Sequence, residues 1–183
     1  MAADRPEGLV LVSGPSRGGK SRWAEHLIAS CAEVTYVATS LARPGDASWQ
    51  QRLKLHRERR PSHWHLLECD GQLLDAVNKA PEHHALLIDA LGGFTASYLQ
   101  LDSDQWNTLE TDLLRTLKQR LEPVVMVIEE TGWGVVPPTA IGGLFRDRQG
   151  RFAQRLAIQA NRSWLVVQGR ALDLHALGQA VPL

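Results

Sequence analysis

Lys20 and Ser21 end a glycine-containing run whose spacing fits a phosphate-binding loop. The pattern G-x-x-x-x-G-K-[ST] is matched in order by Gly14, Pro15, Ser16, Arg17, Gly18, Gly19, Lys20 and Ser21. Glycines let successive backbone N–H groups turn toward phosphates, the lysine reaches the β- and γ-phosphates, and the serine hydroxyl ligates Mg²⁺. An apolar run precedes the loop and a helical pattern follows it, which favours nucleoside triphosphate binding over a turn that binds nothing.

A second candidate is the basic run around His56. On a helix, Arg52, His56 and Arg60 fall at i, i+4 and i+8 and share one face. A neutral imidazole is a nucleophile near pH 7, and guanidinium groups can neutralise a triphosphate under attack. A solvated basic face with an incidental histidine explains the same pattern. The pattern alone leaves both interpretations open.

Two apolar runs end in carboxylates. Ala85–Asp89 ends in Asp89, and Val124–Glu130 ends in two acids. In phosphate-loop proteins an acid after a buried strand holds Mg²⁺ or its water shell, although many strands end in Asp for simple capping. The sequence alone does not decide which strand supplies the metal-side carboxylate. We favour Asp89 for the metal and nucleotide, and Glu130 for a supporting or substrate-side role.

The glycine-rich segment that follows the second acidic strand has two interpretations. Gly132 and Gly134 flank Trp133, and Pro137 and Pro138 stiffen the exit. The segment is either a shaped loop that covers a ligand or a surface loop with a packing tryptophan. The arginines of segment 144–151 could likewise be scaffold, or could meet phosphate or a neighbouring subunit.

Composition limits the remaining possibilities. With 183 residues we expect a single domain over 1–183. Lys+Arg and Asp+Glu number 20 each, and this balance argues against nucleic-acid binding. The two cysteines have no disulfide or metal spacing. The start of the chain lacks a signal-peptide pattern, and no apolar run approaches the ~20 residues of a membrane span, so we expect a cytoplasmic protein.

Apolar strand-like runs alternate with helical patterns, which predicts an α/β fold with a mostly parallel central sheet flanked by helices. We expect strands near Gly8–Ser13, Val34–Ala38, Trp64–Glu68, Ala85–Asp89, Pro123–Glu129 and Ser163–Gln168. We expect helices near Lys20–Cys31, Ser48–Arg60, Leu73–Lys79, Asp104–Leu121 and Leu144–Asn161, with a short one near the C-terminus.

These motifs, in this order, resemble one family. The runs are LVSGPSRGGKSRWAE, VTYVATS, RLKLHRERRPSHW, LLIDAL, EETGWGVVP, FRDRQGR and WLVVQG. The chain resembles the bifunctional adenosylcobinamide kinase/adenosylcobinamide-phosphate guanylyltransferases of cobalamin biosynthesis, nearly end to end. The resemblance implies a RecA-like phosphate-loop fold, Mg²⁺, ATP and GTP as substrates, and adenosylcobinamide and its phosphate as partners. It also implies a homo-oligomer, with at least some members trimeric.

The implied chemistry has two steps: phosphorylation of the aminopropanol hydroxyl of adenosylcobinamide, then transfer of GMP from GTP through a GMP–histidine. His56 aligns with the guanylylated histidine, and Lys20 with the kinase lysine. The implied nucleotide contacts are Gly14 to Ser21, Thr39, Ser40, Arg57, Glu58, Arg59, Arg60, Glu68 and Asp89. Among the departures, Glu129 stands where many members carry Asn.

Two other functions stay open at this point: a small-molecule kinase that forms no covalent nucleotide, and a non-catalytic nucleotide-binding protein. Within the bifunctional hypothesis there is a geometric conflict. The kinase step needs the γ-phosphate in line with an alcohol, whereas guanylylation needs the α-phosphorus near His56. We therefore expect the segment Leu41–Arg60 to move between the two steps.

Overall fold

The structure is a computed structural model that describes residues 5–40 and 45–181, except for the side chains of residues 48, 49, 52 and 56. Its centre is a sheet with the strand order β3-β2-β4-β5-β1-β6-β7 among the described residues. The strands are β1 (Leu9–Gly14), β2 (Val34–Ala38), β3 (His65–Glu68), β4 (Ala85–Asp89), β5 (Val124–Glu129), β6 (Arg162–Val167) and β7 (Arg170–Asp173). All pairs are parallel except β6 with β7.

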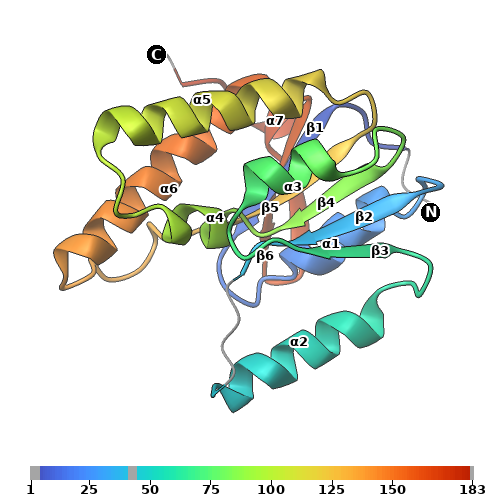
Figure 1. Cartoon of the computed structure of the whole chain (residues 1–183), viewed down its shortest axis with the longest axis horizontal. Coiled ribbons are helices and arrows are strands. Elements are labelled where there is room, and N and C mark those ends of the chain that lie inside the picture. The colour runs from blue at the N-terminus through green and yellow to red at the C-terminus, as the bar shows by residue number, and fades with distance from the viewer. Residues whose placement is uncertain (1–4, 41–44, 182–183) are drawn as a thin grey trace.

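Helices connect these strands (Figure 1). They are α1 (Lys20–Ile28), α2 (Ala47–Arg59), α3 (Leu73–Lys79), α4 (Leu91–Ser97), α5 (Ser103–Gln119), α6 (Ala140–Gln159) and α7 (Leu174–Leu177). Helix α5 begins with a capping box, in which Asp102 accepts from the Gln105 N–H and the Gln105 side chain accepts from the Asp102 N–H. No helix in the described part of the chain is long and apolar enough to cross a bilayer.

Two apolar layers hold the sheet. On one face, side chains of α3, α4, α5 and α6 pack with Leu86, Ile88 and Met126 of the central strands. On the other face, α1 packs with Val10, Val12 and their neighbours. Strands β4 and β5 are therefore buried on both faces, as their continuous apolar sequences predict. Helix α2 lies apart from both layers (Figure 1).

The predicted α/β fold is confirmed, and every predicted strand and helix is present with ends shifted by a few residues. Two elements were not predicted, α4 and β7. Because β1 to β6 are parallel, their carboxyl ends lie at one edge of the sheet. This edge carries the loops that follow β1, β2, β4 and β5.

Candidate active site

The phosphate-binding motif forms the turn between β1 and α1. Arg17 (φ 59°) and Gly19 (φ 108°) are in the left-handed region, which lets consecutive N–H groups face a common centre. The Lys20 side chain is buried beneath the turn, and its Nζ donates to the carbonyl oxygen of Pro15 at 2.8 Å. The Gly18 N–H donates to the same oxygen at 3.2 Å. The loop is thus preformed around the lysine that a triphosphate requires.

The loop is also pressed against strand β6, and this explains two of its glycines. A Cβ on Gly14 would lie 2.2 Å from the carbonyl oxygen of Val166, and a Cβ on Gly18 would lie 2.7 Å from it. The Gly169 N–H, in the β6–β7 turn, donates to the Gly18 carbonyl at 3.1 Å. No side chain fits these positions without displacing backbone. The antiparallel hairpin, absent from the sequence prediction, therefore helps to fix the loop.

A depression of about 290 Å³ adjoins the loop, between the start of α1 and this hairpin. Its lining residues are Gly19, Arg22, Trp23, Val166, Gly169 and Ala171. The indole Nε1 of Trp23 is buried and has no hydrogen-bond partner among the described residues. The depression is thus lined by the cation of Arg22, the aromatic ring of Trp23 and backbone such as that of Gly169, next to the phosphate-binding turn.

The acids at the carboxyl edge come from strands adjacent in the sheet. Asp89 ends β4 and accepts a hydrogen bond from the Tyr36 hydroxyl at 2.7 Å. Glu129 ends β5, and its Oε2 accepts from the Gly92 N–H at 2.8 Å. Glu130 lies one residue further, where its Oε1 accepts from the Gly132 N–H at 3.3 Å. Glu129, which we did not single out as a site residue, thus belongs to the carboxylate cluster at this edge.

The charges around Glu129 include one from the phosphate loop. Burial raises the pKa of Glu129, and the charge of Asp89 raises it further. The Gly92 N–H and the positive charge of Lys20 oppose this rise in pKa. Burial also raises the pKa of Tyr36 well above its ordinary value, and Asp89 adds to that shift. Tyr36 is therefore a neutral hydrogen-bond donor that orients Asp89.

Thr39 and Ser40 follow β2 at the same edge. The Thr39 hydroxyl is fully buried, donates to the Ala90 carbonyl and accepts from the Ala90 N–H at 3.0 Å. A Cβ on Gly93 would lie 2.5 Å from this hydroxyl. Thr39 therefore fixes the start of α4 against β2. Ser40 is partly exposed at the last described position before residue 45.

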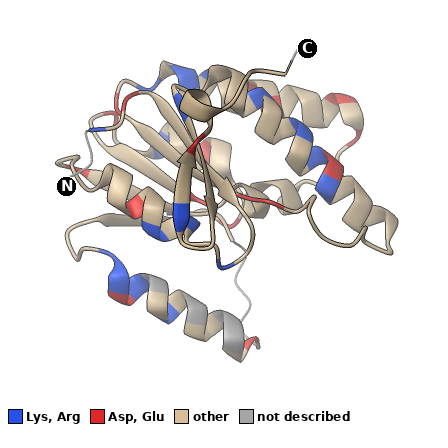
Figure 2. Cartoon of the chain, turned by 180° about the vertical axis from the view of Figure 1, so that it is seen from behind, with Lys and Arg blue, Asp and Glu red and all other residues tan. Residues whose placement is uncertain are grey.

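The basic helix α2 is attached to the rest of the protein by its C-terminal end. Arg59 forms a two-pronged ion pair with Glu25 of α1, and Arg57 lies 3.4 Å from Glu68 of β3. The guanidinium of Arg60 lies 4.4 Å from the centre of the Tyr36 ring, in a cation–π contact. Figure 2 shows Lys and Arg gathered at this end of α2.

The rest of α2 is open to solvent in its described residues. Glu58 is 3.8 Å from Lys54 in an exposed i, i+4 pair, and Leu55 is 56% exposed. His56 belongs to α2, but its side chain lies outside the described part of the structure, as does that of Arg52. The described geometry thus assembles the phosphate loop, the acids and Tyr36 at one edge, with α2 fastened beside them.

The segment after β5 and the arginines of α6 differ in their burial. Trp133 is 60% exposed and Val135 is 93% exposed, so among the described residues the tryptophan is not packed into the core. Arg148, in contrast, is buried in α6 and donates to the carbonyls of Tyr98 and Leu101 at 2.8 and 2.6 Å. Arg148 is scaffold between α6 and the α4–α5 connection.

The fold and the loop define the class of protein: an α/β phosphate-loop protein with a mostly parallel, RecA-like sheet. A crystal structure of a KaiC-like protein from Pyrococcus horikoshii aligns with a TM-score of 0.50 at 16% identity, covering 88% of this chain and 72% of that one. At this identity the likeness shows the fold alone.

The sequence comparisons define the family. Residues 10–174 match the model of the family described as cobinamide kinase / cobinamide phosphate guanyltransferase. The bifunctional adenosylcobalamin biosynthesis protein CobU of Salmonella typhimurium is 36% identical over 177 residues, with 88% of this chain and 96% of that protein covered. The bifunctional adenosylcobalamin biosynthesis protein CobP of Pseudomonas aeruginosa is 35% identical over 167 residues, with 90% of this chain and 95% of that protein covered. The chain belongs to this family of bifunctional transferases.

Proposed function

We propose that this chain catalyses both reactions of its family: phosphorylation of the aminopropanol hydroxyl of adenosylcobinamide, and transfer of GMP from GTP to the resulting phosphate. The observation that carries the proposal is the juxtaposition at the carboxyl edge of the sheet. Asp89 and Glu129 end adjacent strands there, beside the strand that leads into the loop of Lys20. The Arg59–Glu25 pair fastens the helix of His56 to the helix that begins at the phosphate loop.

In the kinase step, the loop amides and Lys20 hold the β- and γ-phosphates of the nucleotide. Lys20 exchanges its contact with the Pro15 carbonyl for phosphate oxygens, at little cost because both are hydrogen-bond acceptors. The substrate hydroxyl attacks the γ-phosphorus and a new P–O bond forms. The bond from that phosphorus to the β-phosphate oxygen breaks, so the nucleoside diphosphate leaves and the hydroxyl proton passes to solvent. Positioning and charge neutralisation supply most of the acceleration.

In the guanylyl step, the His56 imidazole attacks the α-phosphorus of GTP. A P–N bond forms while the bond to the β-phosphate oxygen breaks, so pyrophosphate leaves and a GMP–histidine remains. A phosphate oxygen of the substrate then attacks the same phosphorus and releases the histidine. Charge on the triphosphate is neutralised by three arginines at the fixed end of α2: Arg57, Arg59 and Arg60.

The donor set of the carboxyl edge fits Mg²⁺, which prefers oxygen ligands and keeps several waters. We assign the Ser21 hydroxyl and Asp89 as the residues that hold it, directly or through water, with Glu129 beside them and Glu130 in a supporting position. When bound, the ion neutralises phosphate charge. Tyr36 keeps Asp89 oriented for this role.

The surroundings suggest where the remaining parts of the substrates lie. We assign the nucleotide base to the depression lined by Arg22, Trp23 and Gly169, because stacking and amide contacts suit a purine. The exposed Trp133 and Val135 offer an apolar cover for the cobinamide. We further propose a cytoplasmic enzyme with a single domain over 1–183 that assembles as a homotrimer.

Two variants separate the activities. Lys20→Ala should abolish phosphorylation of cobinamide by γ-labelled ATP. His56→Ala should keep that reaction within about threefold, yet lose all covalent label from α-labelled GTP. Thr108→Ala, an exposed position on α5, is the matched control. A wild-type protein that phosphorylates cobinamide but never takes up the GTP label would instead be a kinase without guanylyltransferase activity.

A further inference from the structure

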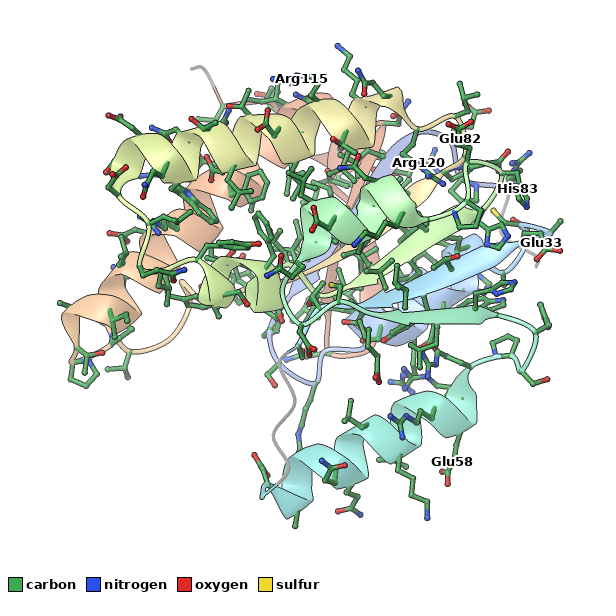
Figure 3. All side chains as sticks on the ribbon, in the orientation of Figure 1. Glu33, Glu58, Glu82, His83, Arg115 and Arg120 are labelled. Atoms are coloured by element: carbon green, nitrogen blue, oxygen red, sulfur yellow. The ribbon has the colours of Figure 1, made fainter. Side chains whose placement is uncertain are left out.

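A cluster of metal-ligating side chains lies at the opposite edge of the sheet from the phosphate loop. Glu33 precedes β2, His84 precedes β4, and His65 is the first residue of β3. Because these strands are parallel neighbours, their amino ends meet at one edge, away from the carboxyl edge that carries the catalytic residues. Figure 3 shows Glu33 and His83 at this end, where β2 and β4 begin.

The strand register brings the three side chains to one face. Thr35 pairs with His65, and Val34 pairs with Ala85, so Glu33 and His84 are the next positions outward on adjacent strands. Side chains two residues apart on a strand share a face, which places Glu33 with Thr35 and hence with His65. Nε2 of His65 lies 3.9 Å from Oε2 of Glu33.

We propose that Glu33, His65 and His84 bind one divalent transition-metal ion of the zinc or cobalt class. One ligand atom from each residue lies within 4.8 Å of the other two. Two imidazoles and a carboxylate form a donor set that such ions favour, with a fourth tetrahedral position for water. Mg²⁺ prefers oxygen ligands to imidazole nitrogens, so the Mg²⁺ that accompanies the nucleotide does not compete for this site.

A hydrogen bond fixes the ring of His84. Its Nδ1 shares a hydrogen bond of 2.8 Å with the Thr35 hydroxyl, and its side chain is 5% exposed. In the tautomer that donates from Nδ1, the lone pair of Nε2 is available to an ion, and metal-ligating histidines are commonly fixed by such a second hydrogen bond. Arg120 donates to the His84 carbonyl at 2.7 Å and holds the loop before β4 in place.

The ion would join three consecutive strands of the sheet. In the described part of the chain, the short strand β3 pairs only with β2, so it is the least supported strand on that side of the sheet. A ligand on β3 and ligands before β2 and β4 tie this edge strand to the sheet. Glu68, at the far end of β3, is the residue that meets Arg57 of α2. The metal thus stabilises a strand that supports the helix of His56.

The test titrates the metal-free full-length protein with ZnCl₂ by calorimetry, in the presence of excess Mg²⁺ and without nucleotide. We expect one equivalent per chain and a rise in Tm with zinc. His65→Ala and Glu33→Gln, both at exposed positions, should each weaken binding at least tenfold. His63→Ala, an exposed histidine outside the cluster, should leave affinity unchanged.

Substitution of cobalt provides a second readout that does not depend on stability. Co²⁺ held by nitrogen and oxygen in a tetrahedral site gives visible absorption, which should be present in the wild type and absent in His65→Ala. Equal zinc affinity in the wild type and His65→Ala would overturn the proposal. So would a wild type that retains no zinc after gel filtration.

Discussion

Arg59 and Glu25 face each other between α2 and α1, with the arginine Nε donating to Oε2 at 2.6 Å and Nη2 donating to Oε1 at 2.7 Å. The Glu25 side chain is 11% exposed and that of Arg59 is 34% exposed. One partner lies three residues after His56, and the other lies on the helix that begins with Lys20. This pair sets how α2 lies relative to α1.

Glu25→Gln should therefore impair the guanylyl step selectively. The variant removes the charge and the two-pronged geometry, and a hydrogen bond to a charged group contributes about 1.5–3 kcal/mol. Since 1.36 kcal/mol corresponds to a factor of ten, we expect GMP–protein formation to slow about tenfold or more. Cobinamide phosphorylation should change less than about threefold. Both rates are measured with labelled nucleotides.

The control for this variant is Lys54→Ala, which removes an exposed charge from the same helix. It should leave both rates near those of the wild type. Equal slowing of the two steps in Glu25→Gln would mean that the ion pair supports the phosphate loop and not the position of α2.

Gly18→Ala should damage the phosphate loop because the added methyl would lie 2.7 Å from the Val166 carbonyl oxygen. We expect a lower Tm and nucleotide binding weakened at least tenfold, measured by calorimetry. In contrast, Gly150→Ala meets nothing within 4 Å and lies inside α6. That control should raise stability by roughly 0.5–1 kcal/mol, since glycine is unfavourable in a helix interior. Unchanged nucleotide affinity in Gly18→Ala would contradict this account of the loop.

Much of this architecture could be predicted from sequence, and the failures have physical causes. The apolar runs of β4 and β5 and the phosphate loop were recognisable because burial and phosphate binding restrict residue types closely. Helix α4 was missed because Gly92 and Gly93 disfavour helices, yet the Cβ-free backbone is what lets Glu129 and Thr39 approach. Strand β7 was missed because it is short and depends on the hairpin turn at Gln168 and Gly169.

The candidate site was predicted only in part for a similar reason. Sequence identifies which residues end a strand, but strand order decides which of them meet. Glu129 and Glu130 are adjacent in sequence, and only the hydrogen bond from the Gly92 N–H shows which carboxylate faces the start of α4. The sequence did not point to Tyr36, because its hydroxyl donates to Asp89, a residue 53 positions away in the chain.

Glu129 should make stability depend on pH in a defined direction. Burial raises its pKa in the folded state above the ordinary value, so folding favours the protonated form. Its stabilising contribution is then present below the pKa of the unfolded chain and is lost as the pH rises through the folded pKa. The Tm of Glu129→Gln minus the Tm of the wild type should therefore be larger at pH 8 than at pH 5. A difference in Tm that shrinks between pH 5 and pH 8 would contradict this assignment.

Helix α2 should change its exposure to solvent when GTP reacts. Arg57, Arg59 and the adjacent Arg60 hold the C-terminal end of α2, so a movement of this helix between the two steps must pivot about these contacts or break them. We expect hydrogen exchange of the Ala47–Arg59 amides to slow after incubation of the wild type with GTP, and to change less in His56→Ala. Identical exchange of these amides in the free and guanylylated protein would count against movement of α2.

The most direct test of the whole account is peptide mass spectrometry after incubation of the wild-type protein with GTP and Mg²⁺. We predict a mass increase corresponding to one GMP, located on His56 and sensitive to acid, as a phosphoramidate must be. The adduct should be absent in His56→Ala and should disappear from the wild type when cobinamide phosphate is added. A GMP adduct on another residue, or none in a protein that consumes GTP to make the cobinamide product, would contradict the assignment of His56 as the nucleophile.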